Sequence, residues 1–124
     1  RKMAFQNFED LQVWQRSMDL AEQVYRATDG LRRFVLKDQI ERSSLSIPSN
    51  IAEGQERDTP KEFARFLRIA KGSCGELRTQ LMLAERIGVF IDVDLPIMIR
   101  ETREISAMLR GLVRSVEKQI QSPA

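Results

Sequence analysis

The segment Ser43-Ser44-Leu45-Ser46-Ile47-Pro48-Ser49-Asn50-Ile51-Ala52-Glu53-Gly54 keeps helical apolar spacing straight through a proline. Ile47 and Ile51 lie one turn apart on the same face, so we predict that a helix passes through this segment. Pro48 has no N–H to donate to the carbonyl of Ser44, and its ring crowds that turn, so the helix should be kinked. We expect nearby serine hydroxyls to bind the freed carbonyl, and Gly54 to close the helix in the left-handed conformation.

Apolar spacing on either side of this segment predicts four amphipathic helices, at about residues 8–28, 35–53, 60–87 and 94–119. The third is the most regular, because its apolar and small residues repeat in alternating steps of four and three: Phe63, Leu67, Ala70, Cys74, Leu77, Leu81 and Ala84. The connections are short and no alternating strand pattern occurs. We therefore predict an all-α fold, an antiparallel up-down-up-down four-helix bundle with a proline kink in the second helix, formed by residues 1–124 as a single domain.

The first helix carries more apolar residues than one packing seam requires. Its main stripe is predicted to contain Leu11, Trp14, Met18, Ala21 and Tyr25. Val13, Leu20 and Val24 widen that stripe, and this flank could be buried between subunits. A charge introduced at Val13 is therefore expected to disrupt an assembly.

Several residues have the types and positions of helix caps. The predicted caps are Asn7 for the first helix, Thr59 followed by Pro60 for the third, Gly88 at the end of the third, and Asp92 or Asp94 for the fourth. Gly72 and Gly75 lie inside the third helix, where each costs about 1 kcal/mol relative to alanine. We expect these two glycines to mark a close crossing against another helix.

Charge is unevenly distributed along the 124 residues. The formal net charge is +2, with −1 in residues 1–58 and +3 in residues 59–124. A polycationic coat is therefore not indicated, and any basic surface must come from how the charges are arranged. No stretch approaches the roughly 20 apolar residues of a membrane span, and Arg1-Lys2 is followed by no apolar signal core. We expect a cytoplasmic protein without membrane contact.

The absence of histidine limits the chemistry that the chain can perform. It excludes Ser-His-Asp and Cys-His nucleophile arrangements, the usual zinc sites and the Glu-x-x-His pairs of di-iron bundles. Cys74 is the single cysteine, and its place on an apolar stripe predicts a buried, inert thiol. Asn50 and Glu53 could bind an ion beside the kink, although such residues more often satisfy freed backbone groups. We predict no enzyme activity, no catalytic residue, no metal site and no cofactor.

Five motifs occur in an order typical of one family. They are Phe8-x-x-Leu11-x-Val13-Trp14-Gln15, Gln39-Ile40-x-Arg42-Ser43, Ser46-Ile47-Pro48-Ser49-Asn50-Ile51-Ala52-Glu53-Gly54, Glu62-Phe63-x-x-Phe66-Leu67-x-Ile69-Ala70-x-Gly72-Ser73 and Glu76-Leu77-x-Thr79-Gln80-Leu81. On these motifs the chain resembles the four-helix-bundle proteins encoded in intervening sequences of bacterial 23S ribosomal RNA genes. It is also similar to the accessory variability determinant of diversity-generating retroelements. It departs from the usual pattern at Arg78, where an acidic residue is frequent.

The resemblance implies an assembly and a class of partner. Its members form rings of five bundles, so a homo-oligomer, and specifically a homopentamer, is implied. The retroelement relatives bind nucleic acid and a reverse transcriptase through basic surface residues, which implies RNA, DNA or such a protein as a partner. The resemblance implies no reaction.

Two basic helix faces are the candidate nucleic-acid contacts. Lys61, Arg65 and Arg68 share a face of the third helix, while Arg103, Arg110 and Arg114 share a face of the fourth, with Arg100 close by. Arginine suits phosphate because its planar fork donates two parallel hydrogen bonds. Glu62, Glu101 and Glu104 lie on the same helices, and we expect no exposed aromatic residue among the basic ones for base stacking.

Two function classes therefore remain open. The first is a non-enzymatic oligomeric accessory protein that binds RNA or DNA through these basic faces. The alternative is a structural or protein-interaction module that docks a partner protein and binds no nucleic acid.

Overall fold

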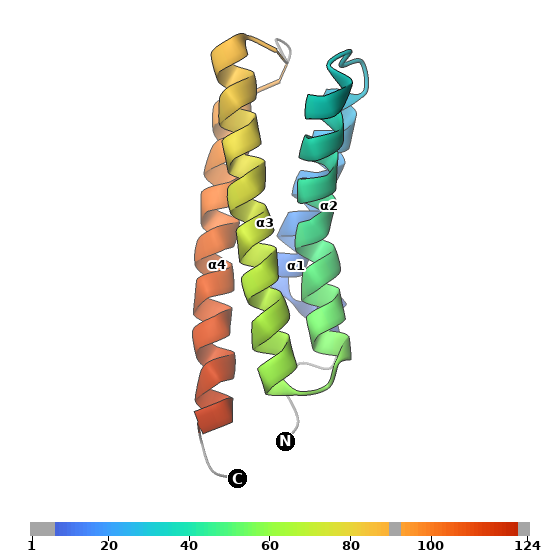
Figure 1. Ribbon diagram of the computed structural model, residues 1–124. Coiled ribbons are helices and arrows are strands. Elements are labelled where there is room, and N and C mark those ends of the chain that lie inside the picture. The colour runs from blue at the N-terminus through green and yellow to red at the C-terminus, as the bar shows by residue number, and fades with distance from the viewer. Residues whose placement is uncertain (1–6, 90–92, 122–124) are drawn as a thin grey trace.

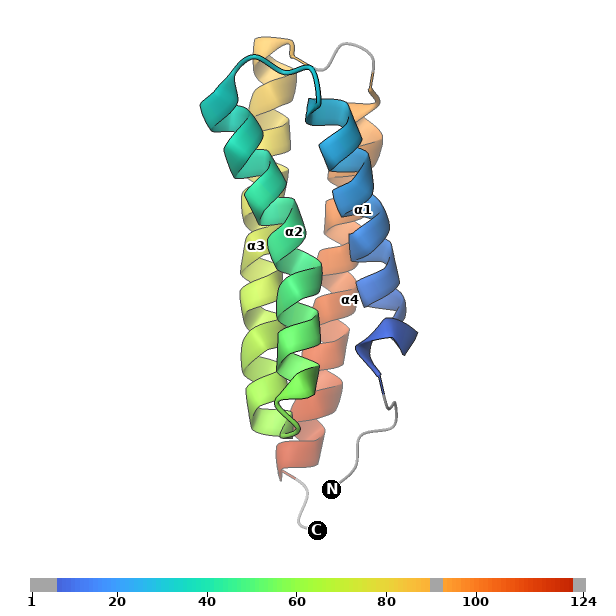
Figure 2. The same ribbon diagram turned by 90° about the vertical axis from the view of Figure 1, so that its right-hand side faces the viewer.

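A computed structural model describes residues 7–89 and 93–121 of the chain. Its elements are the short 3-10 helix η1 (Phe8–Asp10) and the helices α1 (Gln12–Thr28), α2 (Phe34–Glu56), α3 (Pro60–Ile87) and α4 (Leu95–Gln121). Consecutive helices run in opposite directions, and contacts join α1 to α2, α2 to α3, α3 to α4 and α4 back to α1 (Figures 1 and 2). The predicted all-α four-helix bundle is confirmed.

Three of the four helices bury the residues that their spacing selects. Every member of the predicted α3 stripe, from Phe63 to Ala84, is buried, and so are Ile40, Ile47 and Ile51 of α2. These side chains form one hydrophobic cluster together with residues from α1 and α4. No helix within the described residues combines the length and apolar content needed to cross a bilayer.

The helix α1 is rotated relative to the prediction. Val13, Leu20 and Val24 are 4%, 1% and 0% exposed and lie in the core, whereas Met18 and Tyr25 are 41% and 42% exposed. The predicted subunit-facing flank is therefore the core-facing side, and part of the predicted stripe is on the surface. The buried side also contains Ser17, whose hydroxyl donates to the Trp14 carbonyl at 2.9 Å and so makes burial of this polar side chain inexpensive.

The helix α2 stays continuous across Pro48. The hydroxyls of Ser43 and Ser44 donate to the carbonyls of Ile40 and Glu41, at 3.2 and 2.8 Å, rather than to the Ser44 carbonyl that the proline frees. The prediction that these serine hydroxyls bind the carbonyl freed by Pro48 is therefore wrong. The kink itself remains a prediction.

Helix ends agree with the sequence at three positions. The Thr59 side chain accepts from the Glu62 N–H, Gly88 adopts the left-handed conformation with φ 75°, and Asp94 Oδ1 accepts from the Ile97 N–H at 3.1 Å. Asp92, the alternative cap for α4, lies outside the described residues. Asn7 does not cap α1, because it precedes η1 and α1 begins only after Leu11.

Gly54 has a different role from the one predicted. The helix α2 continues to Glu56, and the positive φ of the following turn, 64°, is at Asp58. A Cβ added to Gly54 would lie 2.6 Å from the Cβ of Phe66, so this glycine marks the close approach of α2 to α3. The close crossing predicted for Gly72 and Gly75 is wrong, since a Cβ at either position meets nothing within 4 Å.

Candidate nucleic-acid interface

The outer face of α4 carries a stripe of basic side chains. Arg100, Arg103, Arg110 and Arg114 are all exposed, and Lys118 continues their spacing by one further turn. All five residues lie in the single helix α4. At a rise of 1.5 Å per residue, the five cations extend over about 27 Å. We call this set of five residues the α4 basic stripe.

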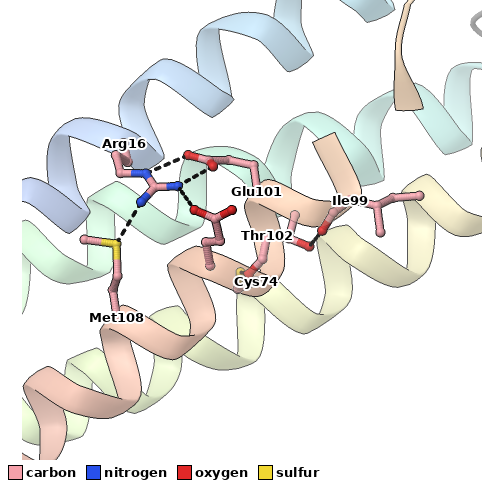
Figure 3. A network of polar contacts seen from close by, with 7 residues as sticks. Arg16, Cys74, Ile99, Glu101, Thr102 and Met108 are labelled. Carbon is pink, nitrogen blue, oxygen red and sulfur yellow. Dashed lines mark hydrogen bonds and ion pairs between the residues drawn. The ribbon is translucent and has the colours of Figure 1, made fainter. Parts of the chain in front are cut away.

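Two glutamates of α4 contact an arginine of α1. Arg16 of α1 donates to both oxygens of Glu101, at 2.9 and 2.5 Å, and to Glu104 Oε1 at 2.5 Å (Figure 3). Its third nitrogen contacts the sulfur of Met108 at 3.5 Å (Figure 3). The hydrogen bonds to Glu101 and Glu104 raise the pKa of Arg16 above its ordinary value. Arg16 therefore pairs both glutamates with α1, and its single positive charge offsets one of their two negative charges.

A third glutamate of α4 is paired with α3. Arg68 forms an ion pair with Glu117, which joins the two helices near the end of the bundle where α3 begins. Arg68 is thus engaged within the chain and contributes less to a phosphate-binding surface than its exposure alone indicates. The pair also compensates Glu117, which lies three residues after Arg114 on α4.

The remaining basic residues of α3 lie beside an aromatic ring. The guanidinium of Arg65 stacks 4.8 Å from the ring centroid of Phe66, and that of Arg57 lies 4.9 Å from the same centroid. Arg57 is further held by Glu53 at 2.8 Å and by Glu62 at 3.4 Å. Lys61 is exposed at the start of α3. Of the predicted α3 face, Arg65 thus contacts a ring, Arg68 is paired with α4, and Lys61 is exposed.

The motif residues of α2 have structural partners. Asn50 donates to the carbonyl and hydroxyl oxygens of Ser46, at 2.8 and 2.9 Å, and the Ser46 hydroxyl shares a 2.7 Å hydrogen bond with that of Ser73 on α3. Glu53 pairs instead with Arg57, so Asn50 and Glu53 have different partners. Pro48 is buried beside them. This motif holds α2 against α3.

Cys74 is buried at the centre of the α3–α4 contact. Its thiol donates to the carbonyl of Thr102 at 2.9 Å, and Arg78 donates to the hydroxyl of the same threonine at 2.9 Å. Burial raises the pKa of Cys74, which disfavours the reactive thiolate. Within the described residues, no group of three or more Cys, Asp or Glu side chains is arranged to hold a metal ion. Figure 3 shows Cys74 and Thr102 below the Arg16 cluster.

Sequence reasoning missed Arg16 and Lys118. Arg16 pairs with Glu101 across 85 positions of sequence, and such a distant pair leaves no local pattern. Lys118 could have been found, because it lies four residues after Arg114 and so falls on the same helix face.

Comparisons with known proteins are consistent with this fold. The model of a family described as 23S rRNA-intervening sequence protein matches residues 9–111. A solved structure from Bacteroides thetaiotaomicron, of a protein with unknown function from the S23 ribosomal protein family, is similar with a TM-score of 0.73 and 24% identity. That similarity covers 82% of this chain and 97% of the other and concerns the fold alone. No curated protein matches the sequence.

Proposed function

Because the chain belongs to the 23S rRNA-intervening sequence protein family, as its motifs indicated, we propose that it is a self-associating accessory protein that binds RNA or DNA. The contact is the α4 basic stripe, and the protein acts by binding rather than by catalysis. The observation that carries this proposal is the placement of the α4 glutamates. Arg16 engages Glu101 and Glu104 and Arg68 engages Glu117, so these glutamates are held by other helices, and within the described residues no cation of the stripe is held in an ion pair.

The chemistry of the stripe fits a phosphate backbone. Arginines three or four residues apart on a helix are neighbours, about 5–6 Å between Cβ atoms, and each guanidinium can donate two parallel hydrogen bonds to a phosphate. Contacts of this kind release counterions, so binding should weaken steeply as salt is raised. If several copies assemble, repeated weak contacts would add by avidity.

Replacing Arg103 and Arg110 by glutamine should weaken binding to duplex DNA and to structured RNA by about tenfold at low salt. The salt slope of the association constant should fall by about two, because each lost phosphate contact removes nearly one unit. Fluorescence anisotropy over a salt series measures both quantities.

The matched control replaces Arg26 and Arg42 by glutamine. These arginines are exposed and lie in ion pairs within α1 and α2, with Glu22 and Asp38, so the net charge changes equally away from the stripe. Equal losses in the two double variants would show that only net charge matters and would contradict a binding surface on α4.

Self-association is the second part of the proposal, and its candidate surface differs from the one the sequence suggested. Trp14, Met18 and Tyr25 of α1 line an open groove of about 400 Å³ together with Leu45 of α2. Met18, Tyr25 and Leu45 are more than two-fifths exposed. We propose this groove as a contact to a second copy, in line with the ring of five that the family resemblance implies.

Replacing Met18 by glutamate should lower the molar mass of the assembly without unfolding the bundle. The new carboxylate would lose water in the contact between two copies, and the groove is already lined by the acidic residues Asp19 and Glu22. Light scattering coupled to size exclusion gives the mass, and circular dichroism reports the fold. Ile120→Glu, at an apolar position of similar exposure near the end of α4, serves as the control.

The alternative function has the same groove as its supporting observation. An oligomer unaffected by Met18→Glu would exclude the groove from self-association. Wild-type protein that binds neither RNA nor DNA at low salt would favour a module that docks a partner protein there, such as a reverse transcriptase.

A further inference from the structure

The start of α2 exposes an aromatic residue directly after two arginines. Phe34 is 73% exposed and Val35 is 79% exposed, and Arg32 and Arg33 before them are exposed as well. The expectation of no exposed aromatic residue concerned only the basic faces of the third and fourth helices, and Phe34 lies outside both. Phe34 occupies the first turn of α2, at the end of the bundle away from both termini (Figure 1). Its ring therefore offers a free face to solvent.

The charges around Phe34 favour an anion. The first turn of α2 contains no acidic residue. Farther along α2, Asp38 is paired with Arg42 at 2.8 Å, and Glu41 accepts from Lys37 at 3.0 Å and from the Thr28 hydroxyl at 2.5 Å.

Asp29, in the connection from α1, is the one carboxylate of residues 29–37. Against it stand Arg32 and Arg33, together with Lys37, which is engaged by Glu41. The surface next to the ring is therefore basic.

We propose that Arg32, Arg33 and Phe34 form a second nucleic-acid contact, specific for unpaired nucleotides. Phe34 stacks on a base, while the two arginines bind the phosphates on either side of it. A base inside a duplex has both faces covered by its neighbours, so this contact requires a single strand, a loop or a frayed end. The inference rests on the proposed function and extends it, since the α4 basic stripe recognises phosphate without regard to pairing.

The α4 basic stripe starts at the end of the molecule at which Phe34 lies and runs from there along α4. The helices α2 and α4 both begin at the end opposite the termini, and Arg100 falls in the second turn of α4 (Figure 1). The helices themselves are diagonal in the bundle, because within the described residues α2 contacts α1 and α3 but not α4. An apolar protein surface is the competing occupant, because Val35 is exposed beside Phe34.

The test compares a labelled single strand of uridines with a blunt duplex of equal phosphate number, by fluorescence anisotropy. Phe34→Ala should weaken binding to the single strand by about tenfold, the typical loss when one stacked aromatic is removed, and should leave duplex binding unchanged. Phe34→Trp should restore or strengthen it, because the larger ring stacks better. Val35→Ala is the matched control, since it removes exposed apolar surface at the next position without removing a ring.

Each remaining outcome counts against the proposal in a distinguishable way. Equal losses from Phe34→Ala and Val35→Ala would show a general apolar contact and overturn stacking. Salt-dependent duplex binding with a single-strand affinity indifferent to Phe34→Ala would overturn this inference and leave the α4 basic stripe standing. Wild-type protein that binds neither probe would overturn the proposed function and this inference together. Phe34 is largely exposed, so its variants should fold, as circular dichroism would verify.

Discussion

Replacing Gly54 by alanine is expected to destabilise the bundle by about 2 kcal/mol, although alanine is the better helix former. The added methyl would lie 2.6 Å from the Cβ of Phe66 and 3.3 Å from the carbonyl oxygen of Phe63. Both atoms are fixed to the backbone of α3, so no side-chain rotation relieves the clash. The helices α2 and α3 must separate, which loosens the contacts around the buried Phe63. Chemical denaturation measures the change in the free energy of unfolding.

Gly72→Ala is the matched control, and its effect should have the opposite sign. A Cβ there meets nothing within 4 Å, and the residue is exposed inside α3. Alanine should therefore stabilise the protein by up to about 1 kcal/mol through helix propensity alone. If Gly54→Ala and Gly72→Ala both stabilised the protein, or both destabilised it by similar amounts, Gly54 would not be the point of close approach.

The glycines show what local sequence can and cannot predict. The cost of a glycine inside a helix is a local property, and it correctly marked Gly72 and Gly75 as unusual. Whether a close helix contact offsets this cost is a tertiary property, because it depends on which neighbouring helix lies near the glycine. The close contact lies instead at Gly54, where the helix was expected to stop. Glycine is common both at the end of a helix and where two helices approach closely. The sequence pattern therefore did not distinguish these two roles at Gly54.

The helix α1 shows a second kind of ambiguity. Two sets of residues have helical spacing on it, and the more apolar one was predicted to face the core. The structure buries the set that includes Ser17, whose hydroxyl donates to the Trp14 carbonyl, and Thr28, whose hydroxyl donates to Glu41. A count of apolar residues scores such residues as unsuited to the core, although a hydrogen bond to a nearby acceptor makes their burial inexpensive. The α3 stripe was confirmed because no second set of residues competed with it.

The sequence could predict which arginines share a face of α4, but not how the charges around them are balanced. The spacing of Arg103, Arg110 and Arg114 places them on one face without any tertiary information. Whether the neighbouring glutamates cancel them depends on Arg16 and Arg68, which come from other helices. For the same reason the sequence could not show that Arg68 of the α3 face is paired with Glu117 in the folded chain.

Val13→Glu should unfold the bundle rather than merely disrupt an assembly, which reverses the outcome expected from the sequence. Val13 is 4% exposed and belongs to the hydrophobic core cluster. A glutamate there would bury an unpaired carboxylate and remove apolar contacts, at a cost of about 4 kcal/mol or more. A loss of that size approaches the whole stability of a typical small domain. The measurement is the circular dichroism melting curve, with the variant expected to have lost most of its cooperative transition at room temperature.

The comparison with Met18→Glu separates folding from assembly on the same helix. Met18 lies five residues further along α1, on its exposed side, and receives the same charge. The rotation of α1 seen in the structure requires that Val13→Glu abolishes the melting transition and that Met18→Glu preserves it. A folded Val13→Glu variant would restore the helix orientation predicted from apolar counting, because only a surface position accepts an unpaired carboxylate without loss of the cooperative transition.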